Sequence, residues 1–285
     1  MNNMDSKSKV WYVTGAANGL GLNLVKQLLA GGYRVAATSM NLADLECAVG
    51  EANSNFLPLA VDLTKEDSVS ASLQTAADTF GKIDVVVNNE DHRLIGGLEE
   101  LSDREARATF EINVFAMINV IRNSMPHFRK QQSGHIFNIS SVGGFSGGYP
   151  GFSIYCATKF AVIGLSESLA MEAKPFGINV TVVLPGYFRT NLLTSGPVSF
   201  AERQIPEYGI VRDVQQAYQQ ATDYVQEAAP EKAANMIIDV AASGESPLHL
   251  FLGKEACETA DQKMLEVKKD LCLWESIAAH SEING

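Results

Sequence analysis

Hydrophobic and polar positions follow two alternating periods along the first 185 residues of the chain. Short runs rich in β-branched and aromatic residues predict strands, and longer segments with apolar residues three and four positions apart predict helices. The run Val85-Val86-Val87 has no polar alternation, which is typical of a strand buried on both faces. The predicted strands are 10–14, 34–38, 56–61, 84–88, 135–139 and 178–184, and the helices are 19–30, 42–52, 66–80, 103–131 and 154–175.

Strands and helices that alternate in this way indicate parallel βαβ units with right-handed crossovers. We therefore expect an α/β fold, a Rossmann-type doubly wound parallel sheet in a single domain covering 1–285. Residues 1–9 are polar and are expected to be a flexible N-terminus. The irregular segment 187–230 is predicted to be a helical lid. A helix at 231–242 and a strand at 248–252 should precede a C-terminal helical extension, 254–285.

Composition narrows the choice of partners. The chain has 285 residues, 46% of them hydrophobic, and a formal net charge of −11. Acidic groups outnumber basic ones by 18 to 15 in residues 1–200 and by 15 to 7 in residues 201–285. A binder of phosphate backbones or anionic lipid needs a basic surface, so neither nucleic acid nor a membrane is the expected partner.

Four cysteines, Cys47, Cys156, Cys257 and Cys272, form no CxxC pair and are expected to be isolated buried thiols in a reducing compartment. The N-terminus has no apolar stretch typical of a signal peptide, and no apolar run approaches the roughly 18 residues of a membrane span. These features predict a cytoplasmic protein. No cysteine lies among histidines at metal-ligand spacing, so no metal site is expected.

A glycine-rich turn connects the first predicted strand to the first helix. Gly15, Gly19 and Gly21 are spaced G-x-x-x-G-x-G. Glycines allow the backbone to turn tightly and to approach a pyrophosphate, which then lies at the positive N-terminus of the following helix. The turn predicts a dinucleotide site, although a generic tight turn would have the same composition.

Tyr155 and Lys159 lie four residues apart in a predicted helix and therefore share one face. A free tyrosine titrates near pH 10, and a neighbouring ammonium favours the phenolate. The pair thus suits proton transfer at a carbonyl or alcohol oxygen.

These motifs together resemble the classical short-chain dehydrogenase/reductase family (SDR), over about residues 8–255. The matching segments occur in family order: TGAANGLG at 14–21, Asp62-Leu63, Asn88-Asn89, Asn113, Ser140-Ser141, YCATK at 155–159 and Pro185-Gly186. The resemblance implies an NAD(P)-dependent oxidoreductase that interconverts a ketone or aldehyde and an alcohol by hydride transfer, with Tyr155 as general acid/base.

The resemblance also assigns residues. It implies a catalytic set of Asn113, Ser141, Tyr155 and Lys159, in which Lys159 also contacts the nicotinamide ribose and Asn113 kinks its helix. Ser140 competes with Ser141, which lies nearer the expected distance from Tyr155 and is preferred. The implied cofactor-binding residues are Gly15, Asn18, Gly19, Leu20, Gly21, Ser39, Met40, Asp62, Leu63, Asn89, Tyr155, Lys159, Pro185, Gly186, Phe188 and Thr190.

The choice between NAD and NADP depends on the residues after the second strand. Ser39 stands where an acidic residue would bind the ribose 2′-hydroxyl and repel a 2′-phosphate. However, Met40 and Asn18 replace the basic residues that usually bind this phosphate. Neither signature is complete, and NADP(H) is slightly favoured because the repelling acid is missing.

The sharpest departure from the family lies after the fourth strand. The family sequence NNAG reads Asn88-Asn89-Glu90-Asp91 here. If the two acidic side chains face the site, they should weaken the binding of an anionic cofactor, and if they turn to solvent they are harmless. Arg93 could offset their charge. Their presence keeps a second hypothesis open, a catalytically weakened or non-catalytic protein on the same fold.

The substrate side is predicted from apolar residues near the lid: Phe145, Tyr149, Phe152, Leu192 and Leu193. A pocket of this kind suits a small-molecule ketone or secondary alcohol of low charge, although each residue could equally belong to the core. Family members commonly form homodimers or homotetramers through their two long helices, here 103–131 and 154–175. The terminal helix is a candidate either to close over the lid or to extend a subunit contact.

Overall fold

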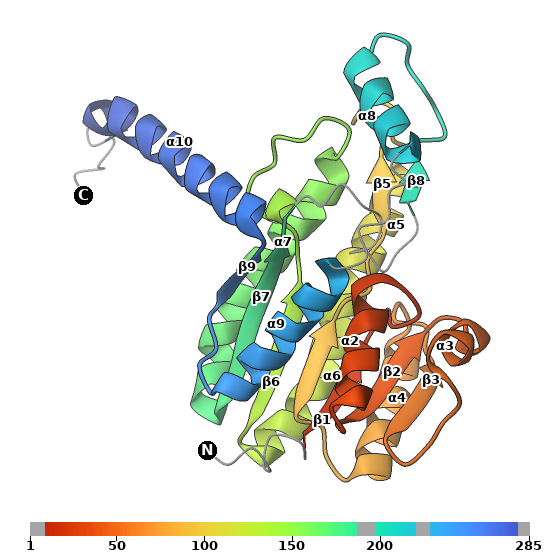
Figure 1. Ribbon diagram of the computed structural model, residues 1–285. Helices are drawn as coiled ribbons and strands as arrows, with labels where there is room; N and C mark the ends of the chain where they lie inside the picture. The colour runs from red at the N-terminus through yellow and green to blue at the C-terminus, as the bar shows by residue number, and fades with distance from the viewer. Residues whose placement is uncertain (1–8, 187–197, 221–228, 279–285) are drawn as a thin grey trace.

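A computed structural model describes residues 9–186, 198–220 and 229–278. Its centre is a parallel sheet of seven strands in the order β3-β2-β1-β4-β6-β7-β9 (Figure 1). This order reverses direction after β1, as in a doubly wound fold, and confirms the predicted Rossmann-type architecture. The strands are β1 (Val10–Val13), β2 (Arg34–Ser39), β3 (Phe56–Ala60), β4 (Val85–Asn88), β6 (Gly134–Ile139), β7 (Ile178–Pro185) and β9 (His249–Leu252).

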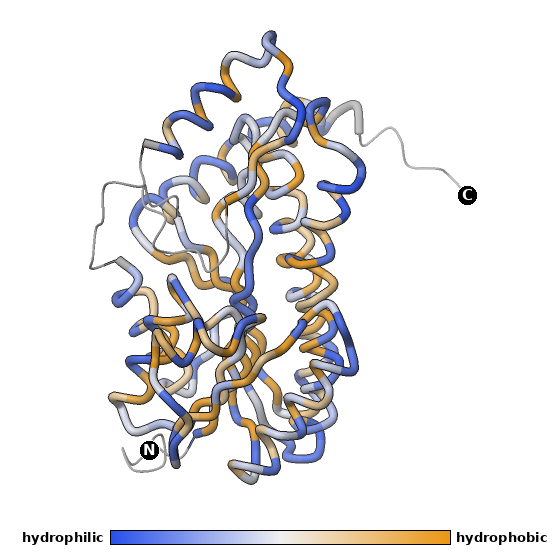
Figure 2. The backbone as a smooth tube through the Cα atoms, turned by 90° about the vertical axis from the view of Figure 1, so that its right-hand side faces the viewer, coloured by the Kyte–Doolittle hydropathy of each residue, from blue (hydrophilic) through white to orange (hydrophobic). Residues whose placement is uncertain are grey.

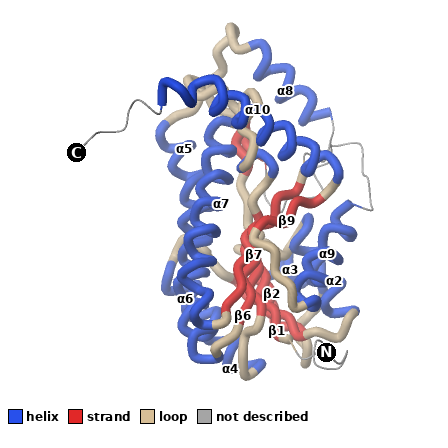
Figure 3. The backbone as a smooth tube through the Cα atoms, turned by 90° about the vertical axis from the view of Figure 1, so that its left-hand side faces the viewer, coloured by secondary structure: helices blue, strands red, loops and turns tan. Residues whose placement is uncertain are grey.

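Helices cover both faces of the sheet (Figure 3). One layer contains α4 (Glu66–Phe80), α6 (Ala116–Gln131) and α7 (Ser153–Ala173), and the other contains α2 (Gly19–Ala30), α3 (Leu42–Val49) and α9 (Ala229–Ser243). Alternate residues of β1 supply both cores, since Tyr12 packs toward the first layer and Trp11 toward the second. Hydrophobic residues are concentrated along these central strands (Figure 2).

Most predicted elements occur within one or two residues of their predicted bounds. The helix predicted for 42–52 ends earlier, at Val49, because Gly50 takes a φ of 121°, which a helix does not accommodate. The long helix 103–131 is present as α5 (Asp103–Phe110), a π-helical turn (Glu111–Phe115) and α6, and it continues past Pro126. The π turn, which contains Asn113, locally changes the direction in which side chains leave the helix.

A second, two-stranded parallel sheet, which the sequence did not predict, lies at the upper right of the molecule in Figure 1. It pairs β5 (Arg93–Ile95) with β8 (Val198–Phe200), and α8 (Gly209–Gln220) follows β8. Buried Glu100 holds these parts together, because its carboxylate accepts from the backbone amides of Gly97 and Ile205, both at 2.7 Å, and pairs with Arg212. The described residues 198–220 of the predicted lid therefore pack on β5 and on the loop that follows it.

Two expectations from the sequence need correction. Cys156 is buried, but Cys47, Cys257 and Cys272 are exposed, because they lie on the outer surfaces of α3 and α10. The stretch Ser153–Phe176 is a helix long and apolar enough to cross a membrane, contrary to the sequence expectation. Nine residues of α7 are buried, and the helix packs against β7, as expected of a core helix. The predicted N-terminus 1–9, apart from Lys9, lies outside the described residues.

The chain ends in α10 (Lys254–Ala278), a helix of 25 residues that projects from the body (Figure 1). Its first turns pack at the carboxyl end of the sheet, where Ala256 lies against Gly186 and Ala260 is buried. Beyond Asp261 almost every described side chain is exposed. The predicted extension 254–285 is thus helical over 254–278, and residues 279–285 lie outside the described residues. The described residues show no packing of the distal half of α10 on the body.

Candidate active site

The glycine-rich turn has a backbone conformation that favours glycine. Gly15 and Gly19 have φ values of 61° and 55°, in the left-handed region. A Cβ atom on Gly21 would lie 2.3 Å from the carbonyl oxygen of Gly15. Asn89 stabilises the turn, since its Nδ2 donates to the carbonyls of Thr14 (3.1 Å) and Gly15 (2.9 Å). The turn is therefore fixed at the N-terminus of α2, with no acidic residue in the first turn of that helix.

Tyr155 and Lys159 lie on the first two turns of α7, and both side chains are buried. The Lys159 ammonium donates to the carbonyl oxygen of Ile139, at 3.2 Å, and lies 5.5 Å from the centre of the Tyr155 ring. The two serines diverge: buried Ser140 donates to the backbone carbonyl of Lys159 (2.9 Å), and half-buried Ser141 accepts from the amide of Gly143 (3.0 Å). Ser140 is thus engaged in packing, and the preference for Ser141 stays a prediction.

Asn113 connects three segments of the site from within the π turn. Its Oδ1 accepts from the His92 amide at 2.7 Å, and its Nδ2 donates to the His92 carbonyl at 2.9 Å and to Thr158 Oγ1 at 3.1 Å. Thr158 in turn donates to the carbonyl of Tyr155 (2.7 Å). Asn113 therefore fixes the loop after β4 against the helix that carries Tyr155 and Lys159.

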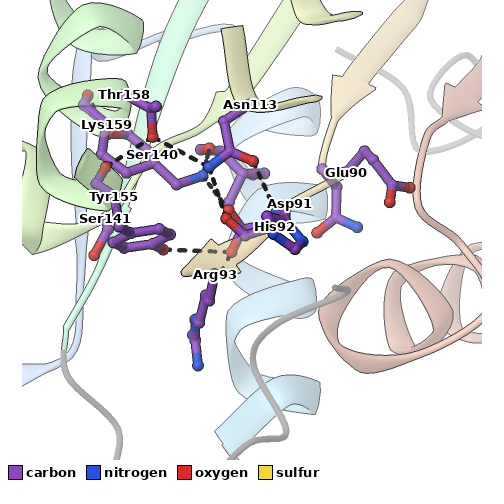
Figure 4. A network of polar contacts seen from close by, with 12 residues as sticks. Glu90, Asp91, His92, Arg93, Asn113, Ser140, Ser141, Tyr155, Thr158 and Lys159 are labelled. Atoms are coloured by element: carbon purple, nitrogen blue, oxygen red, sulfur yellow. Dashed lines mark hydrogen bonds and ion pairs between the residues drawn. The ribbon is translucent and has the colours of Figure 1, made fainter. Parts of the chain in front are cut away.

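Asp91 points into this cluster (Figure 4). Its Oδ1 lies 2.9 Å from Lys159 Nζ, its Oδ2 accepts from the Tyr155 hydroxyl at 3.3 Å, and Arg93 Nε lies 3.8 Å from the same Oδ2. The carboxylate is buried, so these contacts are shielded from water. Of the two orientations considered from the sequence, Asp91 takes the one that faces the site, and Arg93 does offset its charge.

The charges around Asp91 determine the protonation of the cluster. Burial alone would raise the pKa of Asp91, but Lys159 and Arg93 outweigh burial, and the net pKa lies below its usual value. Burial, and then the charge of Asp91, raises the pKa of Tyr155 well above its usual value, although Arg93 acts in the opposite direction. The sequence argument expected Lys159 to favour the phenolate. The difference arises first from burial of the hydroxyl and then from Asp91, which pairs with that ammonium and places a negative charge beside the hydroxyl.

Glu90 points away from Asp91, toward the glycine-rich turn (Figure 4). A Cβ atom on Gly15 would lie 2.9 Å from Glu90 Oε2, so the carboxylate lies directly against this turn. Burial, followed by the charge of Asp91, raises the pKa of Glu90 to about 7. Near neutral pH this side chain is therefore only partly ionised beside the predicted pyrophosphate site.

The remaining predicted cofactor residues line the carboxyl end of the sheet. Asp62 follows β3 and accepts from the amide (3.0 Å) and hydroxyl (2.6 Å) of Thr64, and Leu63 beside it is buried. Ser39 ends β2 and accepts from the amide of Asn41, whereas Met40 is exposed. Asn18 caps α2 without a side-chain bond, Leu20 is buried in α2, and Pro185-Gly186 ends β7. Phe188 and Thr190 lie outside the described residues.

The predicted substrate residues separate into two groups. Phe152 packs beside Tyr155, with ring centres 6.0 Å apart, and Tyr149 joins the same cluster together with Tyr218 of α8. Phe145 instead packs edge-on against Phe251, with centres 5.4 Å apart, in a different part of the core. Leu192 and Leu193 lie outside the described residues. Tyr149 and Phe152 are therefore the predicted pocket residues that adjoin the cluster.

A dinucleotide fits one end of this site better than the other. The turn at Gly15–Gly21 presents the N-terminus of α2, whose amides suit a pyrophosphate, and the Glu90 carboxylate lies against Gly15 in the same place. At the Tyr155 end, Asp91 holds the ammonium of Lys159 that would otherwise be free to meet a ribose hydroxyl. A bound dinucleotide therefore has to accommodate the Glu90 carboxylate at the turn and the Asp91–Lys159 ion pair at the other end. Within residues 9–186, 198–220 and 229–278 no group of three potential metal ligands occurs.

Several contacts in and near the candidate site were not anticipated from the sequence. Thr158, inside the YxxxK segment, connects Asn113 to α7, and Glu100 anchors the described lid. Neither has a local sequence signal, because each acts through residues distant along the chain. Arg93 was noted only as a possible counter-charge, and it also lies over the Tyr155 ring, 6.0 Å from its centre.

Comparison with known proteins agrees with this geometry. The family model described as short chain dehydrogenase matches residues 9–197. A relative named oxidoreductase BOA17, from Botryotinia fuckeliana, is 33% identical and covers 89% of this chain and 92% of its own length. A 3-ketodihydrosphingosine reductase from Bacteroides thetaiotaomicron is 34% identical over 70% of this chain and 71% of its own length. A crystal structure of a short-chain dehydrogenase from Streptomyces avermitilis superposes with a TM-score of 0.87 at 34% identity, covering 96% of this chain and all of that one. The chain belongs to the short-chain dehydrogenase/reductase family of oxidoreductases.

Proposed function

We propose that the protein is an NAD(P)-dependent carbonyl reductase or alcohol dehydrogenase in which Tyr155 exchanges the proton with the substrate oxygen. The observation that carries this proposal is the buried Tyr155 hydroxyl in a cluster with Asp91 and Lys159. Half-buried Ser141, which follows β6, lies beside Tyr155 (Figure 4). A positioned phenol of this kind can donate to a carbonyl oxygen or accept from an alcohol. Ser141 would hold the same oxygen by a hydrogen bond.

The nicotinamide, when bound, supplies or accepts the hydride. Backbone amides of the turn at Gly15 and Gly19 would hold the pyrophosphate, and Asp62 and Leu63 would border the adenine. Ser39 offers no charge against a 2′-phosphate, which supports NADP(H) slightly over NAD(H).

Asp91 also affects the protonation of the Tyr155 hydroxyl. Burial of the Tyr155 hydroxyl raises its pKa, and the charge of Asp91 raises it further, so the hydroxyl is protonated at neutral pH. A protonated tyrosine is ready to donate, so the cluster favours carbonyl reduction over alcohol oxidation near pH 7. The same carboxylate can accept from a ribose hydroxyl, which would let it remain near Lys159 when the cofactor binds.

The substrate side is apolar around Tyr149 and Phe152 and supports a ketone or secondary alcohol of moderate size and low charge. A cytoplasmic homodimer or homotetramer remains part of the proposal. Support for the subunit contact comes from large apolar side chains exposed on the two long helices, namely Phe115, Phe160 and Met171.

One observation favours a second candidate function. Asp91 forms a buried ion pair with the ammonium of Lys159, the group that the family uses to bind the ribose and to lower the pKa of the tyrosine. Such a site would suit a protein that binds a dinucleotide but turns substrate over slowly or not at all.

The experiment that separates the two functions combines calorimetry and kinetics. Binding of NADPH and NADH is measured first, and hydride transfer is then followed by nicotinamide absorbance over a panel of ketones and alcohols. Turnover that depends on Tyr155 supports the enzyme. Tight binding with no turnover on any substrate supports the binding protein, and no binding of either nucleotide contradicts both.

A further inference from the structure

The distal half of α10 carries large apolar side chains that the described residues leave uncovered. Met264, Val267, Leu271 and Trp274 are all exposed, Leu271 by 67% and Trp274 by 56%. They are spaced three and four residues apart, so they form one stripe along the helix. A helix that packs only through its first turns gains little stability alone, and an exposed stripe of this kind marks a contact surface.

The stripe continues a seven-residue repeat from the base of the helix. Cys257 and Ala260 occupy the two earlier positions, so apolar or small residues recur with the spacing that coiled-coil helices use at their a and d positions. Ala260 is buried against the body, whereas Cys257 before it and Met264 after it are exposed. Two other exposed leucines, Leu265 and Leu273, lie off this line of residues and do not belong to the stripe.

We propose that α10 pairs with α10 of a second copy of the chain, antiparallel and about a two-fold axis. The axis would pass between Met264 and Val267, so that Met264 of each copy faces Val267 of the other. Leu271 would then reach the junction where the other helix leaves its body, and Trp274 would lie opposite the small, exposed Cys257. The bulky end of each helix thus meets the end with small side chains.

Charges beside the stripe indicate that the partner is a second α10 and that the two helices run antiparallel. In an antiparallel pair, e positions face e positions and g positions face g positions. This arrangement places Asp261 opposite Lys268 and Lys254 opposite Glu275 on one side. On the other side it places Lys263 opposite Asp270. Every such pair is attractive, and each occurs twice because of the two-fold axis.

A parallel pair would have the reverse charge pattern. There each g position faces the e position that follows it on the partner helix. Lys263 would face Lys268, and Asp270 would face Glu275. The same sequence therefore disfavours the parallel arrangement and complements itself in the antiparallel one. This contact is separate from a contact through α6 and α7. A protein that used both would contain twice as many chains as one that used α6 and α7 alone.

The first test measures the molar mass of the full chain by light scattering across a concentration series. Leu271→Glu should halve the mass of the assembly or raise its dissociation constant at least tenfold. Leu265→Glu is the matched control, since Leu265 is 62% exposed on the same helix but lies off the stripe. It should leave the mass unchanged. An unchanged mass with Leu271→Glu, or an equal loss with both variants, would overturn the proposal.

The second test reads the direction of pairing. Lys263→Glu should weaken association by about tenfold, because in the antiparallel pair the new carboxylate lies opposite Asp270 at two places. Adding Asp270→Lys should restore association. In a parallel pair the single variant would instead strengthen association, since the new carboxylate would then face Lys268. Strengthening by Lys263→Glu, or no rescue by the double variant, would contradict the antiparallel arrangement. Circular dichroism of each variant shows whether the fold is retained.

Discussion

The carboxylate of Asp91 and the ammonium of Lys159 lie 2.9 Å apart, and both side chains are buried. The pair forms in the centre of the candidate active site, where the sequence pattern of the family would place a glycine instead of Asp91. It is also connected to the candidate acid/base, since Asp91 accepts from the Tyr155 hydroxyl. The ion pair and the residues that hold it therefore bear on activity, stability and pH dependence together.

Tyr155→Phe should lower the rate of hydride transfer by about 10²-fold or more, because the substrate oxygen loses its proton donor. The fold should remain intact, since the 3.3 Å contact with Asp91 is a long hydrogen bond. Tyr33→Phe is the control: Tyr33 is also buried, but it packs edge-on against Trp11 on the far side of β1. Equal activity of the two variants would exclude Tyr155 as the acid/base.

The Asp91–Lys159 pair should show strong coupling in its contribution to stability. Asp91→Asn and Lys159→Met should each destabilise the protein by about 3 kcal/mol, because each leaves the other charge buried without its partner. The double variant should lose less than the two single losses combined. Urea unfolding of the four proteins measures the coupling energy. Strictly additive losses would mean that the two groups do not interact.

Asn113→Ala should destabilise the protein by about 1–3 kcal/mol and lower activity, because the backbone amide and carbonyl of His92 lose their partner. Asn119→Ala, further along the same long helix, removes the side-chain donor to the Leu63 carbonyl, away from this loop, and is a suitable control. The loop that carries Asp91 should be released by the first change and not by the second, which hydrogen exchange at residues 90–93 would detect. Equal protection in both variants would contradict the positioning role of Asn113.

Glu90 should make dinucleotide binding sensitive to pH. Its pKa is raised to about 7, so below that value it is mostly neutral and above it the carboxylate faces the pyrophosphate site. Affinity for NADPH should therefore fall about tenfold as pH rises from about 6 to about 8, and Glu90→Gln should remove most of this dependence. Calorimetry at several pH values measures the effect. A wild-type profile as flat as that of the variant would refute it.

The same shift predicts a change in folding stability. A carboxyl whose folded pKa is raised stabilises the fold below its unfolded pKa, near 4.5, and loses that contribution as pH rises through about 7. Relative to Glu90→Gln, wild type should therefore lose about 1–3 kcal/mol of unfolding free energy over this window. Urea unfolding of both proteins at pH 5 and pH 8 tests this. A constant difference between them would show that Glu90 keeps its ordinary pKa.

Much of the fold could be predicted because βαβ units repeat one local pattern. Strands such as 84–88 and helices such as 66–80 are specified by apolar periodicity and end at turn residues such as Gly81, whose φ is 82°. The short strand Arg93–Ile95 could not be predicted, since it is three residues long and pairs with a segment about 105 positions away. Its pairing depends on tertiary contacts, which periodicity does not encode.

The candidate site was predictable where the family motif fixes residue types and less so where the chain departs from it. Tyr155, Lys159 and Asn113 occur in the order of the motif and come together in space. The orientation of Asp91 had two open answers, because the sequence does not show whether a loop side chain turns inward. Burial beside Lys159 and Arg93 decides it, since two cations offset the cost of burying the carboxylate.

The most direct test of the role of Asp91 is the pH dependence of alcohol oxidation in wild type and in Asp91→Asn. Oxidation needs Tyr155 as a base, and burial, followed by the charge of Asp91, raises the pKa of its hydroxyl. Wild type should therefore gain activity only at alkaline pH, and the midpoint should move to lower pH by about one unit or more in the variant. Identical midpoints in the two proteins, or a move to higher pH in Asp91→Asn, would contradict the claim that Asp91 controls the proton of Tyr155.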